Sequence, residues 1–241
     1  MTGQILWRLS ALHGFYSSLH YLPDFTGDSV RELVITTIKD SCLCINGANG
    51  SVLWNYTASS KFPPYEDALD LLLDMNQDGV NEIIAATYKY SSDNKGRVIC
   101  LDGRTGTKLG EWSSSSLTNY NVRGVCIINP YSATIAAGLS SGLVQYLVWR
   151  NNTFKEDVSF STGLINCLTR VSTLGASSDE VPDILCGTTD LLYALDGVNA
   201  SELWRLELTY ADVSSFSVRT VLLLPDVTGD DYFDILVVGY S

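Results

Sequence analysis

The sequence predicts an all-β fold, a β-propeller built of four-stranded blades, because two hairpin motifs alternate along it. One motif is an apolar strand, a turn rich in Asn, Asp and Gly, and a second strand with a bulky residue near its end. It occurs at residues 42–54, 100–112 and 193–204. The other motif places an acidic turn between two apolar strands, at residues 24–35, 74–85 and 226–237. The motifs return about every 50 residues without an amphipathic helix between them, as in a propeller.

The phase of the repeats predicts four whole blades and a divided fifth. The blades occupy residues 11–58, 66–113, 122–160, 164–207 and, for the divided blade, 218–241 with 2–9 as its closing outer strand. The third and fourth blades are degenerate copies that fill the expected positions. Because the divided blade lacks its third strand, two alternatives stay open: a small closed ring of five blades, or a piece of a larger propeller.

Two kinds of signature in these repeats resemble known propeller families. The acidic turns, such as DMNQD at 74–78, resemble the FG-GAP repeats of integrin α-subunits. The hairpins that end at Trp54 and Trp204 resemble quinoprotein-type, or PQQ-like, repeats, and Trp7 matches the same position. Blades with both signatures are similar to FG-GAP/PQQ-like ectodomains of certain membrane-anchored eukaryotic proteins and their prokaryotic relatives. The resemblance spans nearly the whole chain and implies the fold, whereas a propeller by itself implies no particular activity.

The tryptophans at the ends of these hairpins are expected to pack against the neighbouring blade. Quinoprotein propellers place an indole at the end of the outer strand in this way, and the equal phase of Trp7, Trp54 and Trp204 favours packing over ligand stacking. In the second blade Gly110 occupies this position and Trp112 lies two residues later. We expect that blade to dock differently.

The acidic turns carry the clearest chemistry. Positions 1, 3, 5 and 9 of each turn supply side-chain oxygens and position 7 a backbone carbonyl, which suits a hard cation with six to eight oxygen ligands. We therefore predict Ca²⁺ at up to three sites, the second-blade turn having the best pattern. The ligands are Asp74, Asn76, Asp78, Val80 and Glu82; Asp226, Thr228, Asp230, Tyr232 and Asp234; and Asp24, Thr26, Asp28, Val30 and Glu32.

A simpler interpretation of these turns is that the aspartates only cap backbone N–H groups. Capping needs one or two aspartates, whereas three carboxylates in one turn raise one another's pKa unless a cation neutralises them. The glycine that follows position 5 in the second blade is replaced by Ser29 in the first and Asp231 in the last. The related segment at 175–183 lacks ligands at two positions, and we expect no metal there.

The sequence offers little support for catalysis. Quinoprotein dehydrogenases hold their cofactor with adjacent cysteines, a stacking tryptophan and calcium, whereas Cys42 and Cys44 are separated by one residue. The histidines, His13 and His20, are both near the first strand, and no hydrolase elbow or metal-spaced His/Cys set is present. We expect a non-catalytic module, with a quinoprotein-like enzyme or cofactor carrier as the alternative.

The six cysteines are expected to be buried thiols rather than disulfides. Small apolar residues take their places in other repeats, as Ala194 does for Cys44 and Cys100. Cys126 and Cys167 fall on equivalent inner strands of adjacent blades, so they form the one pair that a disulfide would suit.

Charge and targeting signals restrict partners and compartment. Because 15 Lys and Arg oppose 27 Asp and Glu, the net charge is −12, which disfavours nucleic-acid partners and anionic membranes. No apolar stretch is long enough to span a membrane, and the first residues lack the charged and then apolar order of a signal peptide. Four glycosylation sequons occur, at Asn49, Asn55, Asn151 and Asn199. Together with the calcium turns they favour an extracellular or lumenal location.

The predicted function is to bind a protein or glycan partner on a propeller face. Loops at 89–97, 113–121 and 209–217 combine tyrosine with serine and asparagine, a mixture typical of recognition surfaces. Tyr90, Tyr120 and Tyr210 are the expected contact residues if they face the same side of the ring.

Overall fold

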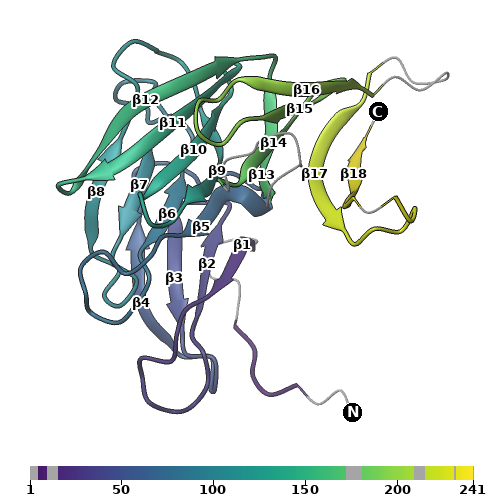
Figure 1. Cartoon of the computed structure of the whole chain (residues 1–241). Helices are drawn as coiled ribbons and strands as arrows, with labels where there is room; N and C mark the ends of the chain where they lie inside the picture. Colours follow the sequence, from purple (N-terminus) through teal and green to yellow (C-terminus); the bar gives the residue numbers. More distant parts are fainter. Residues whose placement is uncertain (1–4, 10–15, 172–180, 209–214, 231, 241) are drawn as a thin grey trace.

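A computed structural model describes residues 5–9, 16–171, 181–208, 215–230 and 232–240 of the chain. In these residues it has four four-stranded antiparallel sheets and one two-stranded sheet, with a single short 3₁₀ helix. Figure 1 shows the sheets arranged as successive blades. The predicted fold class, four whole blades and a divided fifth, is confirmed.

Each whole blade consists of four strands that follow one another along the chain. Blade 1 contains β1 (Tyr16–Tyr21), β2 (Leu33–Thr37), β3 (Ser41–Ile45) and β4 (Val52–Thr57). Blade 2 contains η1 (Glu66–Ala68), β5 (Leu69–Leu71), β6 (Ile83–Ala86), β7 (Val98–Leu101) and β8 (Lys108–Trp112). Blade 3 contains β9 (Val122–Asn129), β10 (Thr134–Leu139), β11 (Leu143–Arg150) and β12 (Thr153–Ser161). Blade 4 contains β13 (Ile165–Val171), β14 (Asp183–Thr188), β15 (Leu191–Leu195) and β16 (Glu202–Glu207), and the divided blade β17 (Ser217–Leu224) and β18 (Asp234–Tyr240).

The hydrophobic core lies between successive blades rather than inside any one of them. Four apolar clusters join blade 1 to 2, 2 to 3, 3 to 4 and 4 to the divided blade. Middle strands such as β3 and β6 are therefore buried on both faces and are continuously apolar in sequence. Outer strands such as β4 alternate between exposed and half-buried residues. The first strands of the blades, β1, β5, β9, β13 and β17, contact one another around the axis of the propeller, and η1 lies among them.

Tryptophans dock successive blades as predicted. The Trp54 indole Nε1 donates a 3.0 Å hydrogen bond to the carbonyl of Gly103 in the next blade, and Trp7 makes the equivalent 2.8 Å bond to Gly47. The ring of Trp54 lies against Gly106, whose φ of +70° and lack of a side chain both suit the contact. Blade 2 docks differently, because Trp112 Nε1 donates to the Glu156 carboxylate at 3.1 Å.

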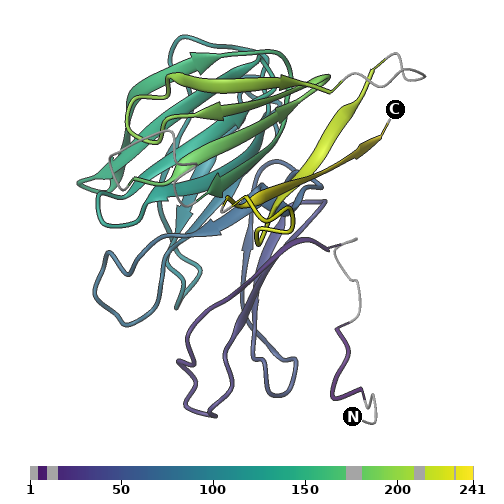
Figure 2. The same ribbon diagram turned by 45° about the vertical axis from the view of Figure 1, so that its right-hand side comes forward.

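The predicted closing strand is not formed by the described residues at the N-terminus. Residues 5–9 have no strand structure, and the sheet of the divided blade contains only β17 and β18 among the described residues. Trp7 and Leu9 pack on the β2 and β3 face of blade 1 instead, and both views show this segment apart from β18 (Figures 1 and 2).

All six cysteines are buried and free, so the Cys126–Cys167 disulfide is not formed. In the core, away from water, each thiol packs as a small apolar group. Among the described residues, no helix has the length and apolar character needed to cross a membrane.

Candidate functional site

Each acidic turn is folded by its own carboxylates. In blade 1 Asp24 accepts backbone hydrogen bonds from Gly27 and Ser29, both at 2.7 Å, and Asp28 accepts one from Val30 at 2.9 Å. Ser29 adopts a φ of +68°, so it takes the left-handed conformation that glycine would take more easily. Asp24 and Asp28 therefore both cap backbone N–H groups of their own turn.

The turns of blade 2 and the divided blade repeat this pattern. Asp74 accepts hydrogen bonds from the N–H groups of Gln77, Asp78 and Gly79, and Asp226 from those of Gly229 and Asp230. The fifth-position carboxylates bond to the seventh-position N–H groups, Asp78 to that of Val80 and Asp230 to that of Tyr232. Asp231 and most of the 175–183 segment lie outside the described residues.

The carboxylate at the ninth position accepts hydrogen bonds from residues near the start of each turn. Glu32 and Glu82 are fully buried, whereas Asp234 is partly exposed. Glu32 Oε1 accepts the hydroxyl of Thr26 at 2.8 Å, and Glu82 Oε1 accepts the N–H groups of Met75 and Asn76 at 2.8 and 3.0 Å. Asp234 accepts the N–H groups of Val227 and Thr228 in the same way.

A second turn, which was not predicted from the sequence, contacts the acidic turns of blades 1 and 2. In blade 1 the Asn46 amide donates to Asp28 at 2.6 Å and to the Thr26 hydroxyl at 3.2 Å. In blade 2 Asp102 accepts a 2.8 Å hydrogen bond from Asn76. Asn46 and Asp102 open the turn between the third and fourth strands, at equivalent positions of the repeat. That equivalence was visible in the sequence, but the contact with the acidic turn depends on how the two hairpins pack.

The carboxylates of blade 1 lie close enough together to share one cation. Oxygen atoms of Asp24, Asp28 and Glu32 all lie within 4.8 Å of one another, and this is the one such group among the described residues. In blade 2 a different observation fits a cation: Glu82 Oε2 is buried and has no hydrogen-bond partner. Burial, and then the charges of Asp74 and Asp78, raise the pKa of Glu82 to about 7 although two backbone hydrogen bonds oppose this. The donor sets of both turns therefore fit Ca²⁺.

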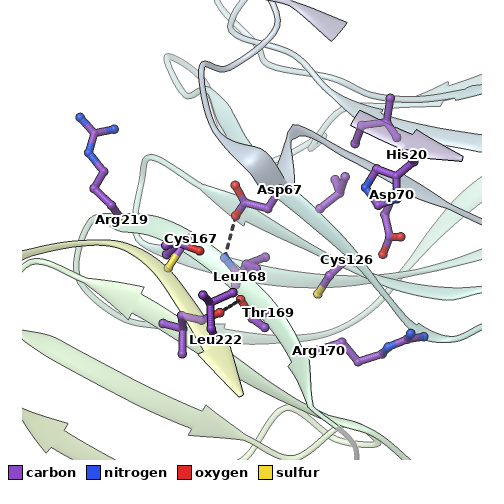
Figure 3. Close-up of a pocket in the computed structure, with 14 residues that line it drawn as sticks. His20, Asp67, Asp70, Cys126, Cys167, Leu168, Thr169, Arg170, Arg219 and Leu222 are labelled. Atoms are coloured by element: carbon purple, nitrogen blue, oxygen red, sulfur yellow. Dashed lines mark hydrogen bonds between the residues drawn. The ribbon is translucent and has the colours of Figure 1, made fainter. Parts of the chain in front are cut away.

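A pocket of about 280 Å³ lies on the propeller axis, between the first strands of the five blades. Its polar lining comes from β1, η1, β5, β13 and β17. Figure 3 shows these side chains, which include His20, Asp67, Asp70, Arg170 and Arg219. The thiols of Cys126 and Cys167 also line it.

The carboxylates of this axial pocket hold the blades together. Asp67 accepts the N–H of Leu168 at 2.7 Å, and Asp70 accepts the N–H of Ile127 at 2.7 Å. The first strand of each blade has a free inner edge, and these bonds satisfy one N–H of β13 and one of β9. Burial, followed by the nearby aspartates, raises the pKa of Cys126 well above its usual range and that of Cys167 to about 12. Both thiols are neutral at physiological pH and are poor nucleophiles.

The predicted tyrosine contacts are not supported. Tyr120 is completely buried, and its hydroxyl accepts a 2.6 Å hydrogen bond from the Ser114 N–H, so the prediction that it binds a partner is wrong. Its ring packs in the core between blades 2 and 3, because burying a large aromatic ring away from water is favourable. Tyr90 is half-buried beneath the guanidinium of Arg97, 4.7 Å from its ring centre. Tyr210 lies outside the described residues.

The four sequon asparagines are all exposed. The Asn49 side chain accepts the N–H of Ser51, and Asn199 accepts that of Ser201, so the two residues occupy equivalent turns in blades 1 and 4. Glycosylation at these positions stays a prediction.

Comparison with known proteins agrees with this architecture. The family model described as outer membrane protein assembly factor BamB, a PQQ-like repeat model, matches residues 1–151, more than half of the chain. The chain belongs to this family. The PQQ-like part of the sequence resemblance is thereby confirmed, and the FG-GAP part stays a prediction. No curated protein sequence matches the chain.

Solved structures similar to this PQQ-like chain share its fold at low sequence identity. Saccharomyces cerevisiae Sqt1 has a TM-score of 0.64 and 13% identity over 93% of this chain and 56% of its own. Two structures of BBS1N in complex with ARL6DN have TM-scores of 0.60 and 0.61, with 10 and 11% identity over 96% of this chain. The match covers 62 and 64% of those chains, so this chain spans less than two thirds of the length of all three. At these identities the similarity shows the fold alone.

Proposed function

We propose that this chain is a non-catalytic scaffold that binds a protein partner on one face of the propeller, while Ca²⁺ stiffens the acidic turns on the opposite face. The main support for this proposal is the structural role of the side chains that line the axial pocket. Its carboxylates, Asp67 and Asp70, bond to backbone N–H groups of other blades, and its thiols are neutral. Two side chains that could perform chemistry there, Asp67 and Asp70, hold the blades together instead.

The two faces differ because the first strands of all blades run in the same direction. The acidic turns follow these strands and gather on the face where the strands end. The opposite face carries the loops before each first strand and after each second strand, and it contains Tyr65, Lys89 and Tyr90. A glycan would use the same face as a protein. The similar structure titled as a complex of BBS1N with ARL6DN supports a protein partner.

Calcium would bind the blade 1 turn through Asp24, Thr26, Asp28 and Glu32, and the equivalent residues of the other two turns. The bound ion supplies charge neutralisation that lets three carboxylates share one turn. The turn residues themselves fix the backbone conformation, since Asp24 and Asp28 cap it. The FG-GAP resemblance supports this assignment. Sites of this kind fill at about millimolar calcium, which together with four exposed sequons supports an extracellular or lumenal location.

The alternative of a quinone enzyme has less support from the pocket. No tryptophan is among the described residues that line it, and Cys126 and Cys167 lie on different strands. These residues do not fit the stacked quinone of PQQ-dependent dehydrogenases. Mixing the protein with quinone and Ca²⁺ and recording the visible spectrum tests this alternative, and a saturable new absorption band would favour it.

Site-directed photo-crosslinking tests the binding function. A photoreactive residue placed at exposed Lys89, on the proposed binding face, should give a defined crosslinked protein in extracts of the source cells. The same group at Val227, which is 73% exposed on the face of the acidic turns, is the matched control. Equal crosslinking at the two positions, or none at either, would contradict the proposal.

Calorimetric titration with CaCl₂ tests the metal separately. Wild-type protein should bind Ca²⁺, and Asp28→Ala should bind one equivalent fewer and show a smaller calcium-induced rise in Tm. Asp157→Ala, at an exposed position of β12, is the control and should behave as wild type. An unchanged stoichiometry in Asp28→Ala would mean that the blade 1 carboxylates only cap their turn.

A further inference from the structure

Three tyrosines and two arginines from three blades converge at one mouth of the axial pocket. We name them the arginine–tyrosine cluster: Tyr65 before η1, Tyr88 after β6, Arg123 in β9, Arg219 in β17 and Tyr240 in β18. Arg219 belongs to the pocket lining, and its side chain extends outward in Figure 3. The cluster therefore lies on the face that we propose for the partner.

Stacking on aromatic rings fixes the two guanidinium groups. The Arg123 Cζ lies 5.8 Å and the Arg219 Cζ 5.2 Å from the centre of the Tyr65 ring. Arg219 also lies 4.8 Å from the Tyr240 ring centre. Arg123 Nη1 donates to the Tyr65 hydroxyl at 3.0 Å and to the Asn166 side chain at 3.3 Å. Both cations are thus held in place by neutral groups.

Neither arginine has an acidic partner among the described side chains. The ion pairs among the described residues involve Arg97, Lys108 and Arg205 instead. The nearby Asp67 is bonded to the Leu168 N–H, and Figure 3 shows the Arg219 side chain extending away from it.

One nitrogen of the cluster is left without any acceptor. Arg123 Nε is buried and makes no hydrogen bond in the structure. A buried donor without a partner destabilises the folded protein, and two neighbouring cations repel each other. An anion bound at this mouth would offset the repulsion between the two cations.

We propose that the cluster binds a carboxylate of the partner, an aspartate or glutamate side chain in an acidic peptide segment. A guanidinium group presents paired N–H donors that match the two oxygens of a carboxylate. The net charge would repel a polyanion such as nucleic acid strongly, and a peptide with one or two carboxylates much less. This inference rests on the proposed binding function and specifies the chemistry of its partner.

The tyrosines would support the bound carboxylate. Burial and the neighbouring Tyr65 raise the pKa of Tyr88 to about 12, although both arginines oppose this shift. The Tyr88 hydroxyl therefore stays protonated at physiological pH.

Nuclear magnetic resonance of the arginine side chains tests the proposal. The capped peptide Gly-Glu-Gly is titrated into ¹⁵N-labelled protein, and its Gly-Gln-Gly counterpart is the neutral control. We expect the glutamate peptide alone to shift the Arg123 Nε–H signal in a saturable manner. Arg219→Gln should weaken this binding about tenfold, the loss typical of one charge-assisted hydrogen bond. Arg205→Gln, at an exposed arginine of β16, should leave it unchanged.

Three results would overturn the inference. They are the absence of a saturable shift, equal binding by Arg219→Gln and wild type, and saturation by inorganic phosphate without saturation by the glutamate peptide. Photo-crosslinking from Lys89 keeps this outcome separate from the proposed function. If Arg219→Gln captured the partner as well as wild type, the carboxylate assignment would be wrong and the binding function would stand. If no variant captured a partner, the binding function itself would fail.

Discussion

Replacing Glu82 by glutamine should remove a specific pH dependence from the stability of the metal-free protein. Glu82 is completely buried beneath the blade 2 turn, and its Oε2 has no hydrogen-bond partner. Burial and the charges of Asp74 and Asp78 raise its pKa from 4.5 to about 7. The folded protein therefore retains a proton that the unfolded chain has released over this interval.

The sign and size of the effect follow from this difference. The stabilisation is fully present below about pH 4.5 and is lost as the pH rises through about 7. At about 1.4 kcal/mol for each pH unit the full loss would be about 3 kcal/mol. Because Asp74 and Asp78 are partly exposed and solvent screens their charges, we expect about 1 to 2 kcal/mol.

Urea unfolding of both proteins in chelator, at pH 5 and pH 8, measures this quantity. Glutamine keeps the oxygen that accepts the Met75 and Asn76 N–H groups, and its unpartnered amide destabilises the protein equally at both pH values. The amide effect cancels when the two pH values are compared. Wild type should lose about 1 to 2 kcal/mol more than Glu82→Gln between pH 5 and pH 8. Parallel changes in the two proteins would refute the assignment of a raised pKa to Glu82.

Three further predictions concern blade packing and the axial pocket. Gly106→Ala should lower the free energy of unfolding in urea by more than about 2 kcal/mol, since the new Cβ would lie 2.6 Å from an atom of the Trp54 indole. Gly229→Ala, the control with φ of +79° but open space around it, should lower it by only about 1 kcal/mol, and equal losses would contradict the docking role of Trp54. Asp70→Ala should lose about 1 to 3 kcal/mol because a buried N–H of β9 is left unbonded, whereas Asp70→Asn should retain most of the stability. Native Cys126 and Cys167 should resist iodoacetamide at pH 8 and react after unfolding, as read by mass spectrometry; rapid native labelling would mean that their pKa values are not raised.

The blade pattern could be predicted from the sequence because it is a local property. Turn residues and strand periodicity act over a few neighbours, so the acidic turn at Asp74 and the hairpin that ends at Trp54 identify their strands without knowledge of the rest of the chain. The docking of Trp54 followed from equal phase in successive repeats. The convergence of Asp24, Asp28 and Glu32 within one turn was predictable for the same reason.

Contacts between repeats were decided only by the tertiary structure. Asp67 bonds to Leu168, which is 101 residues away, and both guanidinium groups of the arginine–tyrosine cluster meet the ring of Tyr65 from other blades. Such contacts depend on the angle and spacing at which whole blades pack, which no local pattern encodes. The same packing buries Tyr120, although its loop is polar in sequence. A side chain's partners across the axis are set by the summed geometry of the blades between them, and this is why the sequence alone determined the strands and turns but not the axial sites.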